Sequence, residues 1–167
     1  HYHLAEGVAA AIARRRPTRL ERLEVRRRRW LPTRALAWML AHPSLVPAVL
    51  RLGFGLSGRN LPASDVVISA GGETLAANVA AARLLKARNV FCGTLRRLPP
   101  EALTLVVSSY ARHAGLPRHL VTLKPNGMDP DRLGPGRSVW DPRSGRPPAL
   151  AGLLVGGDSG FFHYTPQ

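Results

Sequence analysis

Residues 65–92 decide the fold of this protein; they read DVVISAGGETLAANVAAARLLKARNVFC. Residues 65–69 form an apolar run of the kind that parallel sheets bury on both faces. The glycines of residues 70–72 predict a turn, the alanine-rich residues 73–86 predict a helix, and residues 89–92 predict the next strand. A strand, a helix and a strand within so short a stretch indicate a βαβ unit.

Further elements extend this unit along the chain in both directions. Residues 103–108 and 120–123 predict two more short strands, so we expect an α/β protein with a Rossmann-like, doubly wound parallel sheet. Apolar residues at helical spacing between Leu4 and Ile12 predict a first helix. No strand precedes this helix, so we expect sequence to be missing before His1. The remaining predicted elements are a short strand at Leu23–Val25, a helix at Thr33–Leu40, a second helix at Ala48–Leu52 that restarts after Pro43 and Pro47, and a loop at Phe54–Asn60.

The composition changes sharply near the end of the chain. Residues 125–148 are dominated by Pro, Gly, Asp and Arg without apolar periodicity, which is typical of a linker. Residues 150–155 then predict the first strand of a second domain. We therefore expect a Rossmann-like domain at residues 1–124, an interdomain linker at 125–148, and the start of another domain at 149–167.

The net charge of +14 restricts the classes of partner. Of the 24 basic residues only Lys86 and Lys124 are lysines, and the arginines cluster at residues 14–16 and 26–29. Nucleic-acid binding is disfavoured, because no recognition motif accompanies these clusters and the aromatic residues do not alternate with the arginines. A basic face toward anionic lipid or an anionic substrate is the better interpretation. The single cysteine, Cys92, excludes an internal disulfide and fits a reducing compartment.

A glycine-rich loop follows the last predicted strand. Its residues are Gly156, Gly157, Asp158, Ser159 and Gly160. Glycines let a backbone approach a diphosphate closely, and the serine hydroxyl can donate a hydrogen bond. The alternative is an ordinary tight turn, since this is neither GxGxxG nor a Walker A sequence.

A second candidate site lies between the strand at 65–69 and the following helix. Ser69, Gly71, Gly72 and Thr74 stand where open α/β sheets bind ligands, and the helix dipole favours an anion there. The alternative is helix capping, with Thr74 or Glu73 satisfying the first-turn N–H groups. Glu73 is a weak candidate for a catalytic general base, on the condition that it is desolvated.

Other polar residues give weaker signals. Ser108, Tyr110 and His113 follow a predicted strand and either line the cleft or belong to a loop. Cys92 is expected to pack as a small hydrophobic residue. No histidine pair has metal-ligand spacing except His1 and His3 at the terminus, and no G-x-S-x-G elbow is present, so a metal site and a serine hydrolase are not expected.

Taken together, the chain resembles the mitochondrial-fission (elongated mitochondria) family of GT-B-type glycosyltransferases. The resemblance rests on residues 65–71 (DVVISAG), on the stretch through Lys124-Pro125-Asn126, and on residues 154–160 (LVGGDSG) with Tyr164-Thr165 behind them. It covers most of the chain and implies a two-domain GT-B fold, of which this chain is the N-terminal part without its ends. The first domain would face the acceptor, and residues 149–167 would begin the nucleotide-sugar-binding domain, with residues 156–160 as its first loop.

The resemblance implies a nucleotide-sugar donor, an unknown acceptor and no resident cofactor or metal. Asp129-Pro130-Asp131 has the spacing of a metal-binding DxD pair but carries a central proline. Departing diphosphate would be stabilised by loop N–H groups and a helix dipole, and this part alone would be inactive. Alternatives are a non-enzymatic, membrane-associated interaction module of fission type and a nucleotide-sugar epimerase-like protein. The expected location is the cytoplasm, with peripheral association to the inner membrane of a bacterium.

Overall fold

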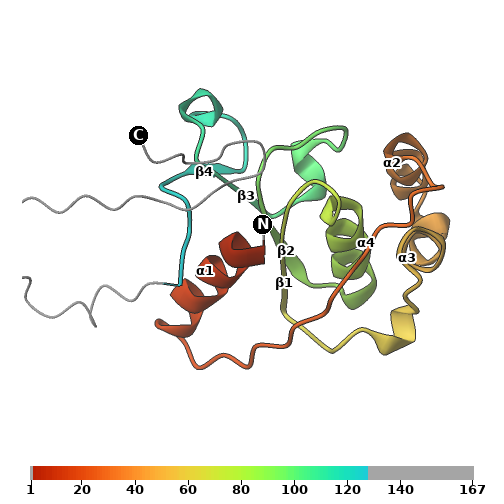
Figure 1. Cartoon of the computed structure of the whole chain (residues 1–167), viewed down its shortest axis with the longest axis horizontal. Coiled ribbons are helices and arrows are strands. Elements are labelled where there is room, and N and C mark those ends of the chain that lie inside the picture. Colours follow the sequence, from red (N-terminus) through yellow and green to blue (C-terminus); the bar gives the residue numbers. More distant parts are fainter. Residues whose placement is uncertain (1, 128–167) are drawn as a thin grey trace, which may run out of the picture. The chain divides into compact units, whose positions relative to one another are not determined.

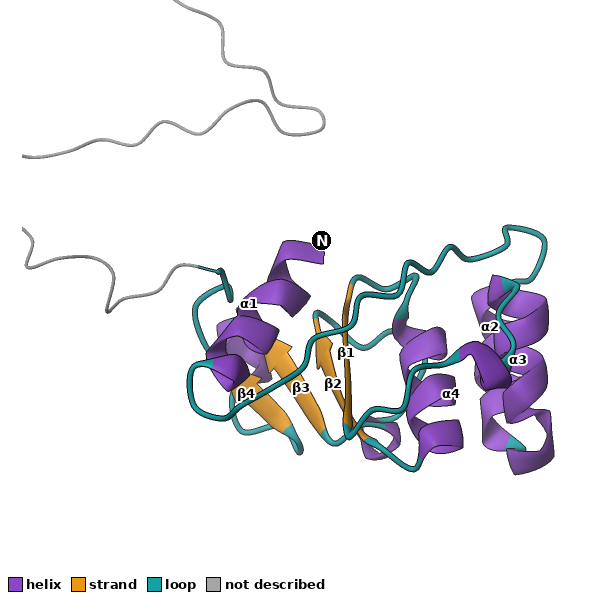
Figure 2. Cartoon of the chain, turned by 90° about the horizontal axis from the view of Figure 1, so that it is seen from below, coloured by secondary structure: helices purple, strands orange, loops and turns teal. Residues whose placement is uncertain are grey.

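The computed structural model describes residues 2–127, and its centre is a four-stranded, all-parallel sheet (Figures 1 and 2). The strands lie in the order in which they occur in the chain, β1-β2-β3-β4. They are β1 (Val66–Ala70), β2 (Arg88–Cys92), β3 (Leu105–Ser108) and β4 (His119–Val121). Ile68 pairs with Val90, Phe91 with Val106, and Val107 with Leu120. The predicted α/β fold with a parallel sheet is therefore confirmed.

Helices cover both faces of this sheet (Figures 1 and 2). Helix α1 (Tyr2–Ala13) packs through Leu4 and Val8 on one face, where the buried strand residues are small, such as Ala70 and Cys92. Helix α4 (Leu75–Leu85) covers the opposite face. There Val79, Ala80, Phe91 and Val106 are wholly buried in the larger core. Alternating strand residues thus supply two separate apolar layers, as a doubly wound sheet requires.

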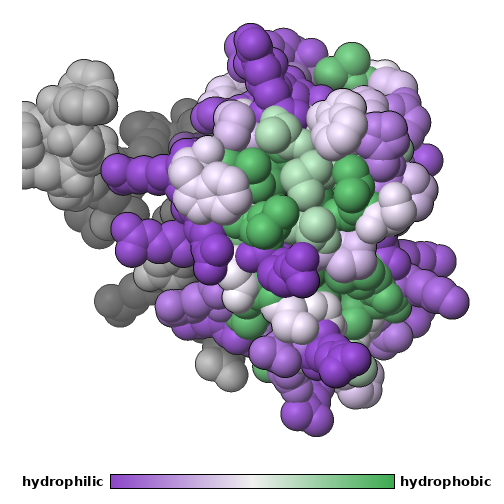
Figure 3. Space-filling view, turned by 90° about the vertical axis from the view of Figure 1, so that its right-hand side faces the viewer, coloured by the Kyte–Doolittle hydropathy of each residue, from purple (hydrophilic) through white to green (hydrophobic). Residues whose placement is uncertain are grey.

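A helical hairpin forms an additional layer outside α4. It consists of α2 (Thr33–Ala41), a 3₁₀ turn at Pro43–Leu45, and α3 (Val46–Phe54). The two helices approach closely because Gly53 has no side chain: a Cβ there would lie 2.8 Å from Leu36 Cδ2. Figure 3 shows hydrophobic side chains gathered on the side of the molecule that this hairpin occupies. Three more 3₁₀ turns lie at Gly58–Asn60, Pro100–Ala102 and Ala111–His113.

The predicted start of the second helix of the hairpin is wrong, although its separation from the first helix is found. Helix α3 begins at Val46 instead of Ala48, because Pro47 falls in the first turn, where its missing N–H group is tolerated. It ends at Phe54 and is followed by Gly55 in the left-handed conformation (φ 71°). Apart from the strand at Leu23–Val25, the other helices and strands predicted within residues 2–127 are found with boundaries shifted by a few residues.

The predicted strand at Leu23–Val25 is wrong. Residues 17–28 contain no regular secondary structure, although they run as an extended segment between α1 and α2 (Figure 1). The backbone N–H of Arg28 donates to the carbonyl of Gly53 at 2.8 Å, so the segment is tied to the end of α3 and not to the sheet. In this segment apolar and basic residues alternate because single side chains pack inward while their neighbours lie in solvent. No helix among residues 2–127 combines the length and the apolar character needed to cross a bilayer.

Candidate anion-binding site

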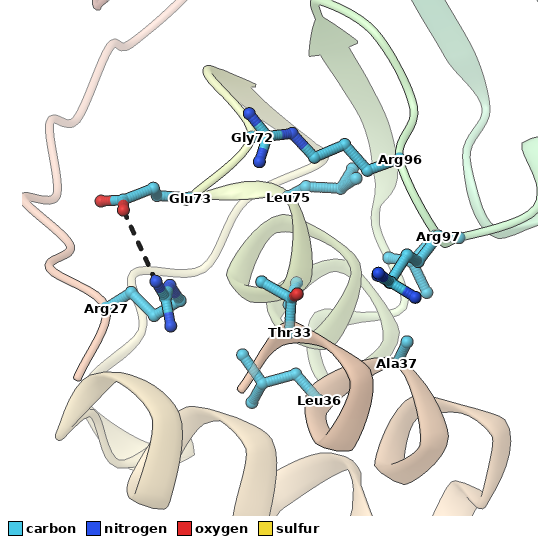
Figure 4. A pocket seen from close by; sticks show the side chains of 11 residues that line it. Arg27, Thr33, Leu36, Ala37, Gly72, Glu73, Leu75, Arg96 and Arg97 are labelled. Atoms are coloured by element: carbon cyan, nitrogen blue, oxygen red, sulfur yellow. Dashed lines mark ion pairs between the residues drawn. The ribbon is translucent and has the colours of Figure 1, made fainter. Parts of the chain in front are cut away.

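The candidate site lies at the turn between β1 and α4, at the carboxyl ends of β1 and β2 (Figure 4). Because the strands are parallel, the segment that leaves β2 reaches the same edge of the sheet as this turn. That segment brings Arg96 and Arg97 to the turn, and the extended segment before α2 brings Arg27. The site is therefore built by three stretches that are distant in sequence.

Two glycines shape the turn. Gly71 adopts a left-handed conformation (φ 87°), and its N–H donates to the carbonyl of Cys92 at 3.4 Å. A Cβ on Gly72 would lie 3.0 Å from Nε of Arg96, so the absence of a side chain lets Arg96 lie across the turn, as Figure 4 shows. Both glycines were predicted, and each has a definite steric role.

The first turn of α4 has no side-chain cap. The hydroxyl of Thr74 donates to the carbonyls of Ala70 and Gly71, both at 3.0 Å, so it points back toward β1. No acidic residue stands in the first helical turn. Capping by Thr74 or Glu73, one of the two interpretations of the sequence, is therefore not found. The acidic side chain at this end of the helix is that of Glu73, which precedes Thr74 and pairs with Arg27.

Glu73 does not meet the condition for a general base. Its side chain is 77% exposed, and one carboxylate oxygen lies 3.6 Å from Nη2 of Arg27. The carboxylate is therefore not desolvated, which was the condition for a general base. Glu73 is better described as the partner that holds Arg27 at the turn.

The side chains of Arg27, Arg96 and Arg97 line one small cavity of about 30 Å³ (Figure 4). Arg27 is largely buried, donates from Nη1 to the carbonyl of Leu31 at 3.0 Å, and keeps a buried Nε with no hydrogen-bond partner in the described structure. Arg96 and Arg97 make no hydrogen bond or ion pair within residues 2–127. The apolar base of the cavity comes from α2 and α4, through Leu36, Ala37, Leu75 and Ala76. One carboxylate and three arginine side chains therefore line a cavity whose remaining surface is mainly apolar.

The four predicted cleft residues do not share one site. Gly72 lines the arginine cavity, whereas Ser69 and Thr74 line a separate cavity of about 140 Å³ beside the outer edge of β1. That cavity is mainly apolar and is partly closed by Leu23 and Val25. Ser69 Oγ is buried there without a hydrogen-bond partner among the described residues. The sequence-based prediction of a single cleft is wrong here because successive side chains at the end of a strand point to opposite faces of the sheet.

The polar residues after β3 form a buried pair and not an open site. Ser108 Oγ lies 2.7 Å from His113 Nδ1, and both side chains are buried. The N–H of Tyr110 donates to the same oxygen at 3.2 Å, while the Tyr110 ring is exposed. Among the two interpretations left open, this geometry favours a hydrogen-bonded turn for Ser108 and His113.

Cys92 packs in the sheet as predicted. It is 1% exposed, and burial raises the pKa of its thiol to about 11. No group of three or more His, Cys, Asp or Glu side chains within residues 2–127 is arranged to hold a metal ion. The predicted diphosphate loop, Gly156, Gly157, Asp158, Ser159 and Gly160, lies outside the described residues.

Sequence reasoning missed the arginines that define the site. Arg27 belongs to the arginine cluster at 26–29, which was interpreted as a solvated basic face. It differs from its neighbours only in that its side chain is buried beside α4. Arg96 and Arg97 follow β2 by a few residues. Their position after the second strand of a βαβ unit was a usable signal, because that segment must return to the carboxyl edge.

Comparison with known proteins finds no relative of this chain. No protein-family model, no curated protein and no solved structure matches the chain.

Proposed function

We propose that this chain is part of a nucleotide-sugar-dependent glycosyltransferase of GT-B type, and that the described domain binds an anionic group of its substrate at the β1–α4 turn. The observation that carries the proposal is the uncapped first turn of α4 faced by Arg27, Arg96 and Arg97. Helix N-termini and arginines both favour phosphate, and their contributions to binding an anion act together.

The chemistry of the cavity supports an anion over a neutral sugar. It is lined by three arginines, and its only acidic side chain already faces Arg27. Its small volume admits only a small group of a substrate, so the rest of a larger substrate would lie outside it. Under this proposal the domain holds an anionic acceptor, and residues 156–160 hold the diphosphate of the donor.

Isothermal titration of the chain with inorganic phosphate and with pyrophosphate tests the anion site. The Arg96→Gln/Arg97→Gln variant should bind at least about tenfold more weakly, because each charged hydrogen bond contributes about 1.5–3 kcal/mol. Arg59→Gln, on the exposed 3₁₀ turn at Gly58–Asn60, is the matched control. Equal affinities for the wild type and the double variant would refute the site.

Titration with nucleoside diphosphates tests the glycosyltransferase part separately. We expect binding that weakens when Gly157 or Ser159 is changed and that persists in the Arg96→Gln/Arg97→Gln variant. If phosphate binds but no nucleoside diphosphate does, the anion site stands and the glycosyltransferase assignment fails.

A further inference from the structure

The α2–α3 hairpin presents one outward face to solvent. On α2 the exposed residues Arg34, Trp38 and Ala41 are spaced by four and three positions, which places them on one side of the helix. On α3 the exposed residues are Pro47, Arg51 and Leu52, while the opposite side packs on α4. The hydrophobic patch in Figure 3 lies on this side of the molecule.

Two exposed tryptophans lie in α2 or just before it. Trp30, which precedes α2, is 63% exposed, and Trp38 is 61% exposed. A contiguous exposed apolar patch marks an interaction site, and Figure 3 shows such a patch on this side of the molecule. Tryptophan has an apolar body and one N–H donor, a combination that suits the boundary between water and the acyl chains of a bilayer.

The charge around this face has a single sign. No acidic residue occurs between Glu24 and Asp65, while this stretch carries seven arginines. They are Arg26, Arg27, Arg28, Arg29, Arg34, Arg51 and Arg59. Arg27 is engaged with Glu73, whereas Arg34 stands four residues before the exposed Trp38 on α2 and Arg51 directly before the exposed Leu52 on α3. The complementary partner is therefore negatively charged and has an apolar layer close beneath its charges.

We propose that the α2–α3 face docks on the surface of an anionic phospholipid bilayer. Trp30, Trp38 and Leu52 would enter the headgroup region, and Arg34 and Arg51 would contact lipid phosphates. A nucleic acid satisfies the charge but offers no apolar layer for the side chain of Leu52, so the bilayer is favoured. This proposal stands independently of the glycosyltransferase assignment.

Binding to vesicles tests the proposal with the full chain. We expect co-sedimentation with phosphatidylglycerol-containing vesicles that decreases at high salt, and little binding to pure phosphatidylcholine. Each arginine near an anionic surface strengthens binding by about fivefold, so Arg34→Gln/Arg51→Gln should weaken it about 25-fold. Arg34→Gln and Arg51→Gln alone should each weaken binding about fivefold, whereas the charge-matched single variant Arg112→Gln, on the 3₁₀ turn after β3, should leave it unchanged.

Tryptophan fluorescence supplies a second readout. In a Trp140→Phe background the emission reports Trp30 and Trp38 alone, and it should shift to shorter wavelength when anionic vesicles are added. Trp38→Ala should weaken vesicle binding, whereas Tyr110→Ala, which removes an exposed aromatic ring on the turn after β3, should not. Circular dichroism confirms that each variant is folded.

Three results would overturn the docking proposal. The first is equal affinity for anionic and zwitterionic vesicles, and the second is an equal loss in the Arg112→Gln control. The third is binding of single-stranded RNA that depends on Arg34 and Arg51, with no vesicle binding and no shift in emission.

Discussion

The side-chain amide of Asn89 donates a hydrogen bond to the side-chain carbonyl of Asn78 at 3.0 Å, and both residues are buried. The amide of Asn78 in turn donates to the carbonyls of Val67 at 3.3 Å and Val90 at 3.1 Å. The carbonyl of Asn89 accepts from the backbone N–H of Thr104 at 2.8 Å. This polar chain connects α4 to β1 and β2 and fixes the entry to β3.

Replacing Asn89 with leucine should destabilise the domain by about 2–4 kcal/mol, because it leaves the buried side-chain carbonyl of Asn78 without its donor and removes the hydrogen bond from the Asn89 amide to the carbonyl of Ala102. Urea unfolding followed by circular dichroism measures the change. Asn60→Leu, at an exposed position in a 3₁₀ turn, is the control and should shift stability by less than about 0.5 kcal/mol. Equal stability of Asn89→Leu and the wild type would show that the network is dispensable.

Gly7 lies within α1, where alanine ordinarily stabilises a helix by about 0.5–1 kcal/mol. Here the effect should have the opposite sign. A Cβ at this position would clash with the backbone nitrogen of Asn126 and would lie 2.6 Å from the carbonyl carbon of Pro125. In Gly7→Ala we expect faster amide hydrogen exchange in α1, because residues 125–126 can no longer pack on it. Gly127→Ala, with open space around the added methyl group, should leave that exchange unchanged; slower exchange in Gly7→Ala would contradict the packing.

Burial raises the pKa of the Cys92 thiol from 9.0 to about 11, so the folded protein retains this proton in a pH range where the unfolded chain loses it. The stabilising contribution is therefore fully present below pH 9 and is lost as the pH rises toward 11. At pH 10 the loss should amount to about 1 kcal/mol in the free energy of unfolding. Urea titrations at pH 8 and pH 10 measure it, and Cys92→Ala should lack this component of the pH dependence. An identical pH dependence in the two proteins would exclude the thiol as its source.

Gly72→Ala should weaken phosphate binding without unfolding the protein. The added methyl group displaces the flexible Arg96 side chain and not the backbone, so the melting temperature should stay close to that of the wild type. Loss of one charged hydrogen bond corresponds to about tenfold weaker binding in calorimetric titration. Gly127→Ala should bind phosphate normally, and retention of full affinity by Gly72→Ala would argue against a role for Arg96.

The βαβ unit could be predicted from sequence because its information is local. The apolar run of β1, the two glycines and the alanine-rich helix each restrict the backbone on their own. The extended segment at Leu23–Val25 was mistaken for a strand because alternation also occurs where a segment packs one side chain at a time. Whether such a segment pairs depends on a neighbouring strand edge, which sequence alone does not reveal.

The candidate site was only half predictable for a related reason. The glycine turn is encoded locally, whereas the convergence of Arg27, Arg96 and Arg97 arises only when three distant stretches meet. The hydroxyl of Thr74 could cap the helix or bond back to β1, and the choice depends on the rotamer that the folded turn imposes. The buried Asn78–Asn89 pair left no pattern in the sequence, since asparagine is common on exposed helix faces.

The order of the strands has a consequence for how the domain is made. Each strand of the described sheet pairs only with its neighbours along the chain, so during synthesis each new strand finds its partner already present. Helix α1 is synthesised first, but the apolar layer in which it packs includes Cys92 of β2 and Val107 of β3. It can therefore pack completely only after these strands have been synthesised. On stalled ribosomes, α1 should become protected from proteolysis only once β3 has left the exit tunnel, which makes the first helix one of the last to be secured.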